Sequence, residues 1–318
     1  MVLKIASRGS TLALWQAEHV KARLEAEHGD LRVQIAIQHT TGDRITDVPL
    51  ARIGDKGLFT KEVDRAVLDG AADLAVHSLK DVPTVLEAGL DLGAITRRED
   101  PRDAVVFGPG PVSSLDDLPP GARVGTSSLR RRAQLLDRRP DVIVEDLRGN
   151  LDTRLRRVAE GDFDAAILAL AGIRRLGREE AVGQVLDAPG WLSAVGQGAL
   201  AIAIRADADS TRALVAVLDH AETRTAVTAE RAFLNELEGG CQVPIGAVAR
   251  VQDQTLTLHG LVASLDGHDV VRGELSGSST DPEGVGRALA RRLADAGATE
   301  ILDAIRGDGP DRAAVPAP

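Results

Sequence analysis

Ala165-Ala166-Ile167-Leu168-Ala169-Leu170 is an uninterrupted apolar run in the middle of the chain. A strand with no polar face is typical of a parallel sheet that helices cover on both sides. A helical pattern at 151–159 precedes the run, and a short helix is expected from Ala169. Strands that alternate with helices predict a parallel α/β sheet.

The same alternation extends over the first two thirds of the chain. In the first part we expect strands at 3–6, 32–38, 73–76 and 90–96 and helices at 11–27 and 60–68, with a loop at 39–56. After a polar, hinge-like break at 97–103 we expect strands at 123–125, 142–144 and 165–168 and helices at 128–137 and 151–159. The break therefore divides the pattern into two α/β lobes.

The pattern changes after Leu200. A strand (AIAIR) and two helices, 212–218 and 222–237, come before three strands at 243–250, 255–264 and 269–275, and helices follow at 281–294 and from 299. This order predicts an α+β third domain. The expected division is 1–99 plus 195–218 for the first lobe, 100–194 for the second, 219–306 for the third domain and 307–318 for a disordered tail rich in Pro, Gly and Ala.

The bulk composition excludes several classes of protein. The net charge of −10 and an aromatic content of 2% argue against a surface that binds nucleic acid. A single cysteine excludes an internal disulfide and a cysteine-rich zinc site. No apolar run approaches the roughly 20 residues of a membrane span, and the N-terminus has no secretory pattern. We therefore expect a cytoplasmic protein.

The one cysteine lies in Glu238-Gly239-Gly240-Cys241-Gln242-Val243-Pro244-Ile245-Gly246. Glycines permit positive φ and a close backbone approach, and Pro244 fixes its own φ. Such a loop can expose a sulfur for thiolate chemistry. A free cysteine also commonly packs as a small buried hydrophobe. The loop by itself leaves both interpretations open.

A second motif, His77-Ser78-Leu79-Lys80-Asp81-Val82-Pro83, follows the expected strand 73–76. Ligands of α/β sheets bind at the carboxyl ends of the strands. A lysine beside Asp81 keeps the carboxylate ionised, so that it can handle protons or stabilise a cation. The alternative is a solvated Lys-Asp loop that ends in proline.

Arginines recur where strands give way to helices. Val124-Gly125-Thr126-Ser127-Ser128-Leu129-Arg130-Arg131-Arg132 joins a strand to hydroxyl caps and then to arginines, and Leu147-Arg148-Gly149-Asn150 repeats the design, with Arg154 one turn later. Arg8 stands at a third such junction. Arginine pairs with carboxylate or phosphate through two parallel hydrogen bonds. The sequence therefore predicts an anion-binding cleft, although it has no GxxxxGK[ST] or GxGxxG motif.

Taken in order, these motifs resemble the porphobilinogen deaminase family. The motifs that carry the resemblance are Ala6-Ser7-Arg8-Gly9-Ser10 with Leu12-Ala13-Leu14-Trp15-Gln16-Ala17, Gly57-Leu58-Phe59, His77 to Pro83, Gly125 to Arg131, Leu147 to Asn150, Val195-Gly196-Gln197-Gly198 and Glu238 to Gly246. Arg52 stands where relatives carry lysine in the loop before Gly57, while Lys56 matches. The resemblance implies two lobes like those of periplasmic binding proteins and a smaller α+β domain that carries the cysteine.

The resemblance also implies an activity, that of hydroxymethylbilane synthase, a transferase of tetrapyrrole and haem biosynthesis. Such an enzyme joins four porphobilinogen units head to tail, each with loss of ammonia, and then hydrolyses the linear tetrapyrrole from the enzyme. The primer is a dipyrromethane cofactor bound through a thioether, here to Cys241. It further implies a monomer with porphobilinogen as its partner, and no metal, nucleic acid or membrane.

Site residues follow by resemblance. Asp81 matches the catalytic aspartate, which stabilises the electron-poor azafulvene that remains when ammonia leaves. The implied cofactor-binding residues are Cys241, Lys80, Ser10, Thr126, Ser128, Arg130, Arg131 and Arg148, and the implied substrate-binding residues are Arg8, Arg148, Arg154, Arg175, Gln16, Phe59 and Gln197.

The implied chemistry agrees with the arginines found at the junctions. Each porphobilinogen carries an acetate and a propionate, so a growing chain brings many carboxylates into one site, where only several cations can offset their repulsion and desolvation. One rival interpretation is a non-catalytic cytoplasmic protein that binds anions on the same two-lobed fold. The presence of both Asp81 and Cys241 argues against it, since capture of an anion needs neither.

Overall fold

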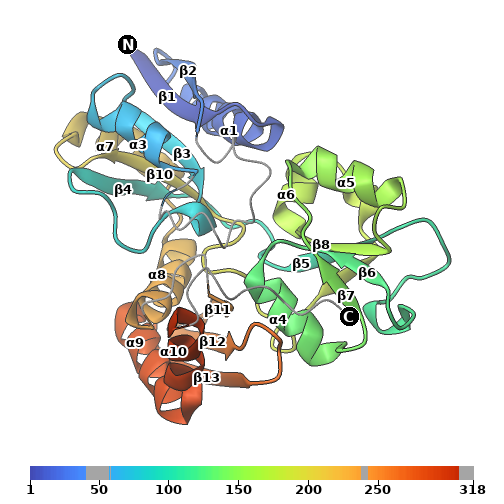
Figure 1. Ribbon diagram of the computed structural model, residues 1–318. Helices are drawn as coiled ribbons and strands as arrows, with labels where there is room; N and C mark the ends of the chain where they lie inside the picture. Colours follow the sequence, from blue (N-terminus) through green and yellow to red (C-terminus); the bar gives the residue numbers. More distant parts are fainter. Residues whose placement is uncertain (41–56, 58, 238–242, 308–318) are drawn as a thin grey trace.

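The computed structural model describes residues 1–40, 57, 59–237 and 243–307. Three sheets form three bodies, and Figure 1 shows the first two side by side above the third. We call the first sheet with its helices the first lobe and the second sheet with its helices the second lobe. The third body is the α+β domain.

The first sheet has the order β2-β1-β3-β10-β4. Its strands are β1 (Val2–Arg8), β2 (Arg32–Gln38), β3 (Leu74–Ser78), β4 (Leu90–Ile95) and β10 (Leu200–Arg205). β1 pairs in parallel with β2 and β3, whereas β10 runs antiparallel to β3 and β4. The sheet is therefore rich in parallel pairs but mixed, because β10 enters it from the second lobe and not from a crossover helix.

The second sheet repeats this plan in the order β7-β6-β8-β5-β9. Its strands are β5 (Asp103–Phe107), β6 (Arg123–Gly125), β7 (Ile143–Glu145), β8 (Ala165–Ala169) and β9 (Gln184–Leu186). Here β5 is the antiparallel strand, paired with β8 and β9. The sequence pattern did not predict β5 and β9. Part of the predicted break 97–103 is thus wrong, since Asp103 opens a buried strand.

Helices pack on both lobes. They are α1 (Thr11–Glu27), α3 (Lys61–Leu68), α4 (Leu129–Arg138), α5 (Leu151–Ala159), α6 (Leu170–Arg175) and α7 (Asp209–Val215), with the short turns η2 (Leu79–Asp81), η3 (Leu115–Asp117), η4 (Glu179–Ala181) and η5 (Ala216–Leu218). Side-chain oxygens of Ser10, Ser128 and Asn150 cap α1, α4 and α5 by accepting from first-turn amides. The caps expected for α4 and α5 are confirmed, and Ser10 caps α1 in the same way.

Two chain segments cross between the lobes and lie against each other. Glu99 N donates to Gly198 O at 3.1 Å, and Thr96 N donates to Leu200 O at 3.0 Å. Gly198 has φ +93°, and a Cβ there would lie 2.3 Å from the Glu99 carbonyl oxygen. The close approach of the two segments therefore requires glycine at this position.

The third body is an antiparallel sheet covered by helices on one face. The order β11 (Ile245–Gln252), β12 (Thr255–Ala263), β13 (Val270–Ser278) is a simple meander, and the helices are α8 (Ala221–Glu236), α9 (Pro282–Leu293) and α10 (Thr299–Gly307), with the π turn η6 (Ala294–Ala298) before α10. A cluster around Phe233, Leu258 and Leu289 forms its core. On the other face Val248 and Leu261 pack with Ala133 and Leu192 of the second lobe.

The helices and strands predicted from the sequence are otherwise confirmed to within a few residues. Most of the 39–56 loop, the Cys241 loop and most of the tail lie outside the described residues. The division into domains at 99, 194 and 218 stays a prediction. Among the described residues, no helix has both the length and the apolar character that a membrane crossing requires.

The crossing of α8 and α9 generates a prediction about stability. A Cβ at Gly286 would lie 2.3 Å from Ala229 O and 2.8 Å from Ala232 Cβ. Gly286→Ala should lower the free energy of unfolding by about 1–3 kcal/mol through overpacking, even though alanine is the better helix former by about 1 kcal/mol. Urea unfolding followed by circular dichroism measures the change. Gly307→Ala, with nothing within 4 Å of its Cβ, is the control; a stabilised Gly286→Ala variant would contradict the packing.

Candidate active site

The carboxyl ends of β1 and β3 lie at the same edge of the first sheet, because the two strands are parallel. Arg8 is the last residue of β1, and the Ser10 hydroxyl accepts from Ala13 N at the start of α1. The turn η2 follows β3 directly and carries Lys80 and Asp81. The topology thus brings together residues from two motifs that are about seventy positions apart in the sequence.

A small cavity of about 100 Å³ lies at this edge. Six of the residues predicted for the site line it: Arg8, Ser10, Gln16, Phe59, Lys80 and Asp81. The Arg8 guanidinium lies 4.3 Å from the centre of the Phe59 ring, a cation–π contact. Gln16 Nε2 donates to Ser78 Oγ at 2.8 Å and so connects α1 to the end of β3.

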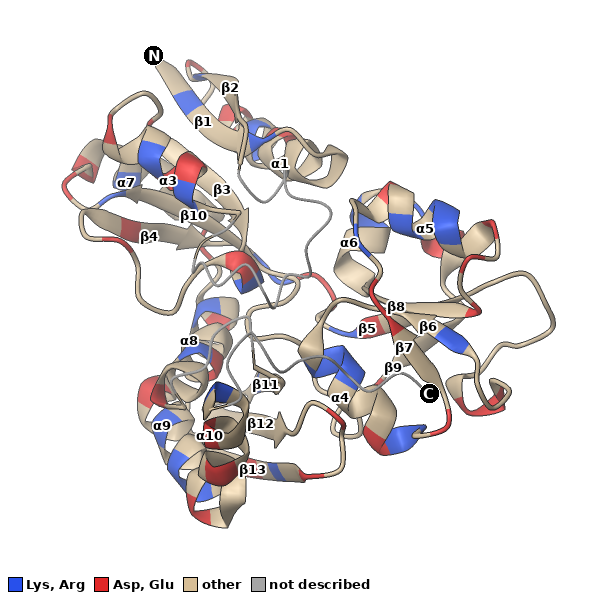
Figure 2. Ribbon diagram, viewed as in Figure 1, with Lys and Arg blue, Asp and Glu red and all other residues tan. Residues whose placement is uncertain are grey.

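The second lobe presents a matching edge. β6 is parallel to both β7 and β8, so the segments that follow these three strands also meet at one edge. Thr126 and Ser128 follow β6, Arg148 follows β7, and α6 with Arg175 follows β8. Blue segments in α4, α5 and α6 mark the lysines and arginines of these helices (Figure 2). The edge is therefore strongly cationic.

The carboxylate of Asp103, on the unpredicted strand β5, organises the arginines. It is fully buried and accepts from Arg130 Nη1 at 2.8 Å and Arg131 Nη2 at 2.7 Å. It also accepts from Trp191 Nε1 and Gln197 Nε2, each at 2.9 Å. The first two arginines of the cluster are therefore held by an internal counter-charge.

These contacts determine the ionisation of Asp103. Burial by itself would raise the pKa of this carboxyl, but the Arg130 and Arg131 guanidiniums hold it well below its usual range. Each of these two arginines also donates to a second acceptor, a backbone carbonyl. Arg130 Nη1 also donates to Leu192 O, and Arg131 Nη1 donates to Ile167 O. Both side chains are thus fixed in place by at least two acceptors.

Lys80 couples the two lobes electrostatically. Burial, and next the Arg131 guanidinium, lower the pKa of Lys80 to about 8, against the opposite effect of the Asp81 and Asp103 carboxylates. Its Nζ donates to Gln197 Oε1 at 3.3 Å. The lysine of the first lobe therefore lies within electrostatic reach of the arginine cluster of the second lobe.

Arg154 and Arg175 are also partly buried. Burial lowers the pKa of Arg154 to about 10, with further lowering by Arg131 and Arg148. Burial likewise lowers the pKa of Arg175 to about 10. Arg154 Nε donates to Gly149 O, and Arg175 Nη2 donates to Gly198 O. Several cations are thus desolvated in one region, where carboxylates of this chain are few.

The residues present fit a bound group with many carboxylates. Lys80 interacts with Arg130 and Arg131, and Arg154 interacts with Arg131 and Arg148, while the carboxylates of Asp81 and Asp103 offset part of this positive charge. Arg131 Nε is buried and has no hydrogen-bond partner among the described residues. An anionic ligand would supply an acceptor for this nitrogen together with further negative charge.

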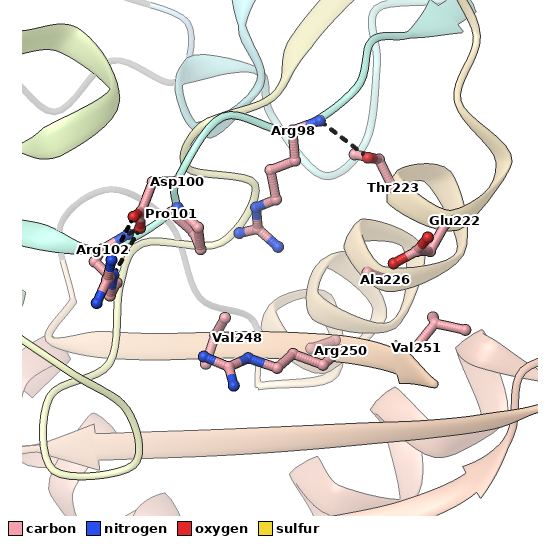
Figure 3. A pocket seen from close by; sticks show the side chains of 11 residues that line it. Arg98, Asp100, Pro101, Arg102, Glu222, Thr223, Ala226, Val248, Arg250 and Val251 are labelled. Carbon is pink, nitrogen blue, oxygen red and sulfur yellow. Dashed lines mark hydrogen bonds and ion pairs between the residues drawn. The ribbon is translucent and has the colours of Figure 1, made fainter. Parts of the chain in front are cut away.

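A larger cavity of about 560 Å³ lies at the junction of the hinge segment, α8 and β11 (Figure 3). Its lining includes Arg98, Arg102, Glu222 and Arg250, and none of the site residues predicted from the sequence. Arg98 and Arg102 already form ion pairs with carboxylates of this chain. Size alone would select this cavity, but the convergence of Asp81, Lys80 and the arginines selects the smaller one.

Sequence reasoning missed two buried carboxylates that hold the site together. One is Asp103. The other is Glu230 on α8, which accepts from Arg98 Nη1 at 2.5 Å and from the amides of Gly196 and Ala249. A signal was present in each case: Asp103 precedes the apolar run AVVF, and Glu230 interrupts the apolar face of a helix. A charge in either setting indicates a buried ion pair.

The structure thus assembles the described site residues from the ends of five strands in two sheets. Gln197 bridges them, because its side chain contacts both Asp103 and Lys80. Thr126 Oγ1 accepts from Ser128 N, so the hydroxyl caps of α4 belong to the same edge. The predicted cysteine, Cys241, lies outside the described residues.

Comparisons with known proteins agree with these motifs. The family description "Porphobilinogen deaminase, dipyromethane cofactor binding domain" matches residues 3–213, and the C-terminal domain of the same family matches 224–295. Porphobilinogen deaminase of Syntrophobacter fumaroxidans is 51% identical over 304 residues, which cover 96% of this chain and 98% of that relative.

Solved structures with a similar outline are more distant. The VFT2 domain of BvgS from Bordetella pertussis has a TM-score of 0.43 and 17% identity over 68% of this chain and 86% of that one. A TRAP periplasmic solute binding protein from Desulfovibrio salexigens has a TM-score of 0.42 and 15% identity, covering 69% and 72%. The fold class therefore rests on the strand orders described above.

Removing the charge of Asp103 tests its role as counter-ion. Asp103→Asn leaves two buried guanidiniums without a full negative charge, which should lower the free energy of unfolding at pH 7 by about 3–5 kcal/mol. Urea unfolding measures the loss. Asp137→Asn, which breaks a partly exposed pair with Arg272, should have a much smaller effect, because water screens that pair. Equal losses in the two variants would contradict the buried-pair assignment.

Proposed function

The chain belongs to the porphobilinogen deaminase family, and from this membership we propose how its residues carry out the reaction of the family. The reaction is that of hydroxymethylbilane synthase, a transferase that condenses four porphobilinogen units with loss of ammonia and releases a linear tetrapyrrole. One observation carries the assignment of residues: Asp81 and Lys80 of the first lobe interact with the arginines of the second.

The cations bind and orient the carboxylates of the substrate. Arg131 and Arg154 are desolvated beside Lys80, so a carboxylate that arrives among them meets preorganised donors and displaces little bound water. Arg8, Arg148 and Arg175 extend the cationic surface over both sheet edges. Together they offset the repulsion among the acetate and propionate groups of successive pyrroles.

Asp81 acts on the reacting atoms. Positive charge develops on the pyrrole as its aminomethyl carbon loses ammonia, and a fixed carboxylate stabilises that charge. The position of Asp81 in the turn η2, between Lys80 and the buried Val82, limits how far the carboxylate can move. The same carboxylate can take the proton that the attacked pyrrole carbon loses when the new carbon–carbon bond forms.

The dipyrromethane cofactor supplies, when bound, the pyrrole end to which the first substrate unit is joined. We assign its attachment to Cys241. Cys241 would hold the cofactor through a thioether from its Sγ to an aminomethyl carbon, which would exchange that carbon's amino group for sulfur with loss of ammonia. Hydroxyl, guanidinium and amide groups at the two sheet edges would hold the cofactor and the substrate. These groups belong to Ser10, Thr126, Ser128, Arg130, Gln16 and Gln197, and the ring of Phe59 lies beside them.

Family membership leaves the rival interpretation, a non-catalytic anion-binding protein, without support. The finer assignments remain part of the proposal: a cytoplasmic monomer that binds no nucleic acid, consistent with the net charge of −10. The proposed domains are 1–99 with 195–218, 100–194 and 219–306. Each of them contains one of the three sheets.

The attachment to Cys241 predicts a mass. Active protein under denaturing conditions should exceed the mass of the bare chain by two porphobilinogen units less the ammonia that they lose. Cys241→Ser should lack the adduct and the turnover while it retains the far-ultraviolet circular dichroism of the wild type. Intact-mass spectrometry decides the matter, and active protein at the unmodified chain mass would refute the attachment.

The charge of Asp81 predicts a separation of binding from chemistry. Asp81→Asn retains the size of the side chain but loses the charge. The cofactor-loaded variant should therefore bind porphobilinogen but scarcely elongate the pyrrole chain. Asp81→Glu keeps the charge but shifts it by about 1 Å, which should slow elongation roughly a hundredfold. Single-turnover mass increments measure each step. If Asp81→Asn elongates at the wild-type rate, the catalytic assignment fails.

A further inference from the structure

We propose that Arg231 on α8 is a positioning residue that holds the Asp81 turn in place from the α+β domain. The inference rests on the proposed function in one respect, namely that Asp81 is the catalytic carboxylate. Its structural basis is independent of that function, because it consists of the contacts between one face of α8 and the segment 79–84.

Arg231 donates only to backbone carbonyls of this segment among the described residues. Its Nη1 lies 3.1 Å from Val82 O, and its Nη2 lies 2.6 Å from Pro83 O and 3.1 Å from Thr84 O. Three consecutive carbonyls thus accept from one planar guanidinium. Because the guanidinium is rigid, these bonds fix the direction of the backbone immediately after Asp81.

The electrostatic setting of Arg231 is unusual for a structural arginine. Burial lowers the pKa of Arg231 to about 10, and no carboxylate among the described residues offsets this effect. A cation that is desolvated without a counter-charge is costly. Elsewhere on α8, Arg224 pairs with the carboxylate of Asp219. The three backbone carbonyls therefore stabilise the buried positive charge of Arg231.

Two further contacts come from the same face of α8. Val227 is fully buried in a cluster with Leu79 and Val82, the residues that flank Lys80 and Asp81. Thr84 Oγ1 donates to Asn235 Oδ1 at 3.1 Å. Positions 227, 231 and 235 are spaced by four and so form one stripe along the helix. This stripe therefore contacts residues on both sides of Asp81: Leu79 before it, and 82–84 after it.

The consequence for catalysis comes from the place of α8 in the chain. The helix ends at Glu236, and the motif that contains Cys241 follows it in the sequence. The same helix therefore contacts the turn that carries the catalytic carboxylate and precedes the proposed attachment point in the sequence. A misplacement of about 1 Å in a reacting group can cost roughly a hundredfold in rate, so loosening this grip should impair elongation without removing any group that touches substrate.

The experiment uses cofactor-loaded full-length variants, with loading checked by intact mass. Arg231→Met removes all three hydrogen bonds and should lower the single-turnover rate of the first elongation step about 10- to 100-fold, with the affinity for porphobilinogen nearly unchanged. Arg231→Lys keeps a donor and should recover part of the rate. Amide hydrogen exchange over 79–84 should be faster in Arg231→Met, whether or not the cofactor is present.

Arg224→Met is the matched control. Arg224 lies two turns earlier on nearly the same face of α8, and it forms its ion pair with Asp219 and not with the turn. This variant should keep both the elongation rate and the exchange of 79–84 close to wild type. If Arg231→Met and Arg224→Met slow elongation equally, Arg231 contributes only to general stability and the proposal fails.

A double-mutant cycle separates positioning from mere support of the fold. In the Asp81→Glu background the carboxylate is already displaced, so adding Arg231→Met should cost much less than it does in the wild type. Full additivity would overturn the proposal. If Arg231→Met elongates at the wild-type rate while Asp81→Asn is inactive, only the positioning role of Arg231 is overturned. If Asp81→Asn itself elongates at the wild-type rate, the catalytic assignment of Asp81 is overturned, and the positioning role with it. Should Arg231→Met fail to fold, Arg231→Lys provides the same cycle.

Discussion

The buried carboxylate of Asp103 is the interaction on which the arrangement of the site depends. One anion without access to water holds two guanidiniums, an indole and an amide. These groups come from α4 and from the segment that returns toward the first lobe. Because a buried charge is stable only when its partners are complete, the position of each of these elements is set by the others. The antiparallel strand β5 is the element that carries Asp103 into the second sheet.

Around Asp103 the site keeps an excess of positive charge, because one carboxylate faces two guanidiniums. Lys80, Arg154 and Arg175 are desolvated, and burial lowers the pKa of each. Partly desolvated cations bind carboxylates more tightly than fully solvated ones would, because water screens them less. The free energy that the fold spends on burying these cations is thus recovered when a ligand with several carboxylates binds. A protein with an overall net charge of −10 can in this way present a local site for polyanions.

α8 links the two crossing segments, the Asp81 turn and the third sheet through adjacent residues. Glu230 is fully buried and ties Arg98 of one crossing segment to the amides of Gly196 in the other and of Ala249 in β11. Arg231, the next residue, contacts the turn that carries Asp81. Figure 1 shows α8 between the first sheet and the helices of the α+β domain. The hinge, the Asp81 turn and the third sheet therefore share one rigid support, so displacement of any one of them is resisted by the other two.

The sequence by itself determined the alternation of helices and strands, the caps of α1, α4 and α5 and the motifs around Arg8, Asp81 and Arg148, because each depends on local periodicity or on neighbours within a few residues. Only the tertiary structure decided which charges face each other. Asp103 was expected in a polar hinge-like break, and the sequence predicted no partner for Glu230, because partners of these residues lie as far as 94 and 132 positions away, respectively. Likewise, β5 and β10 are antiparallel because the chain crosses between lobes at those points. Long-range pairing of buried charges leaves little local pattern, so it appears only when the sheets have assembled.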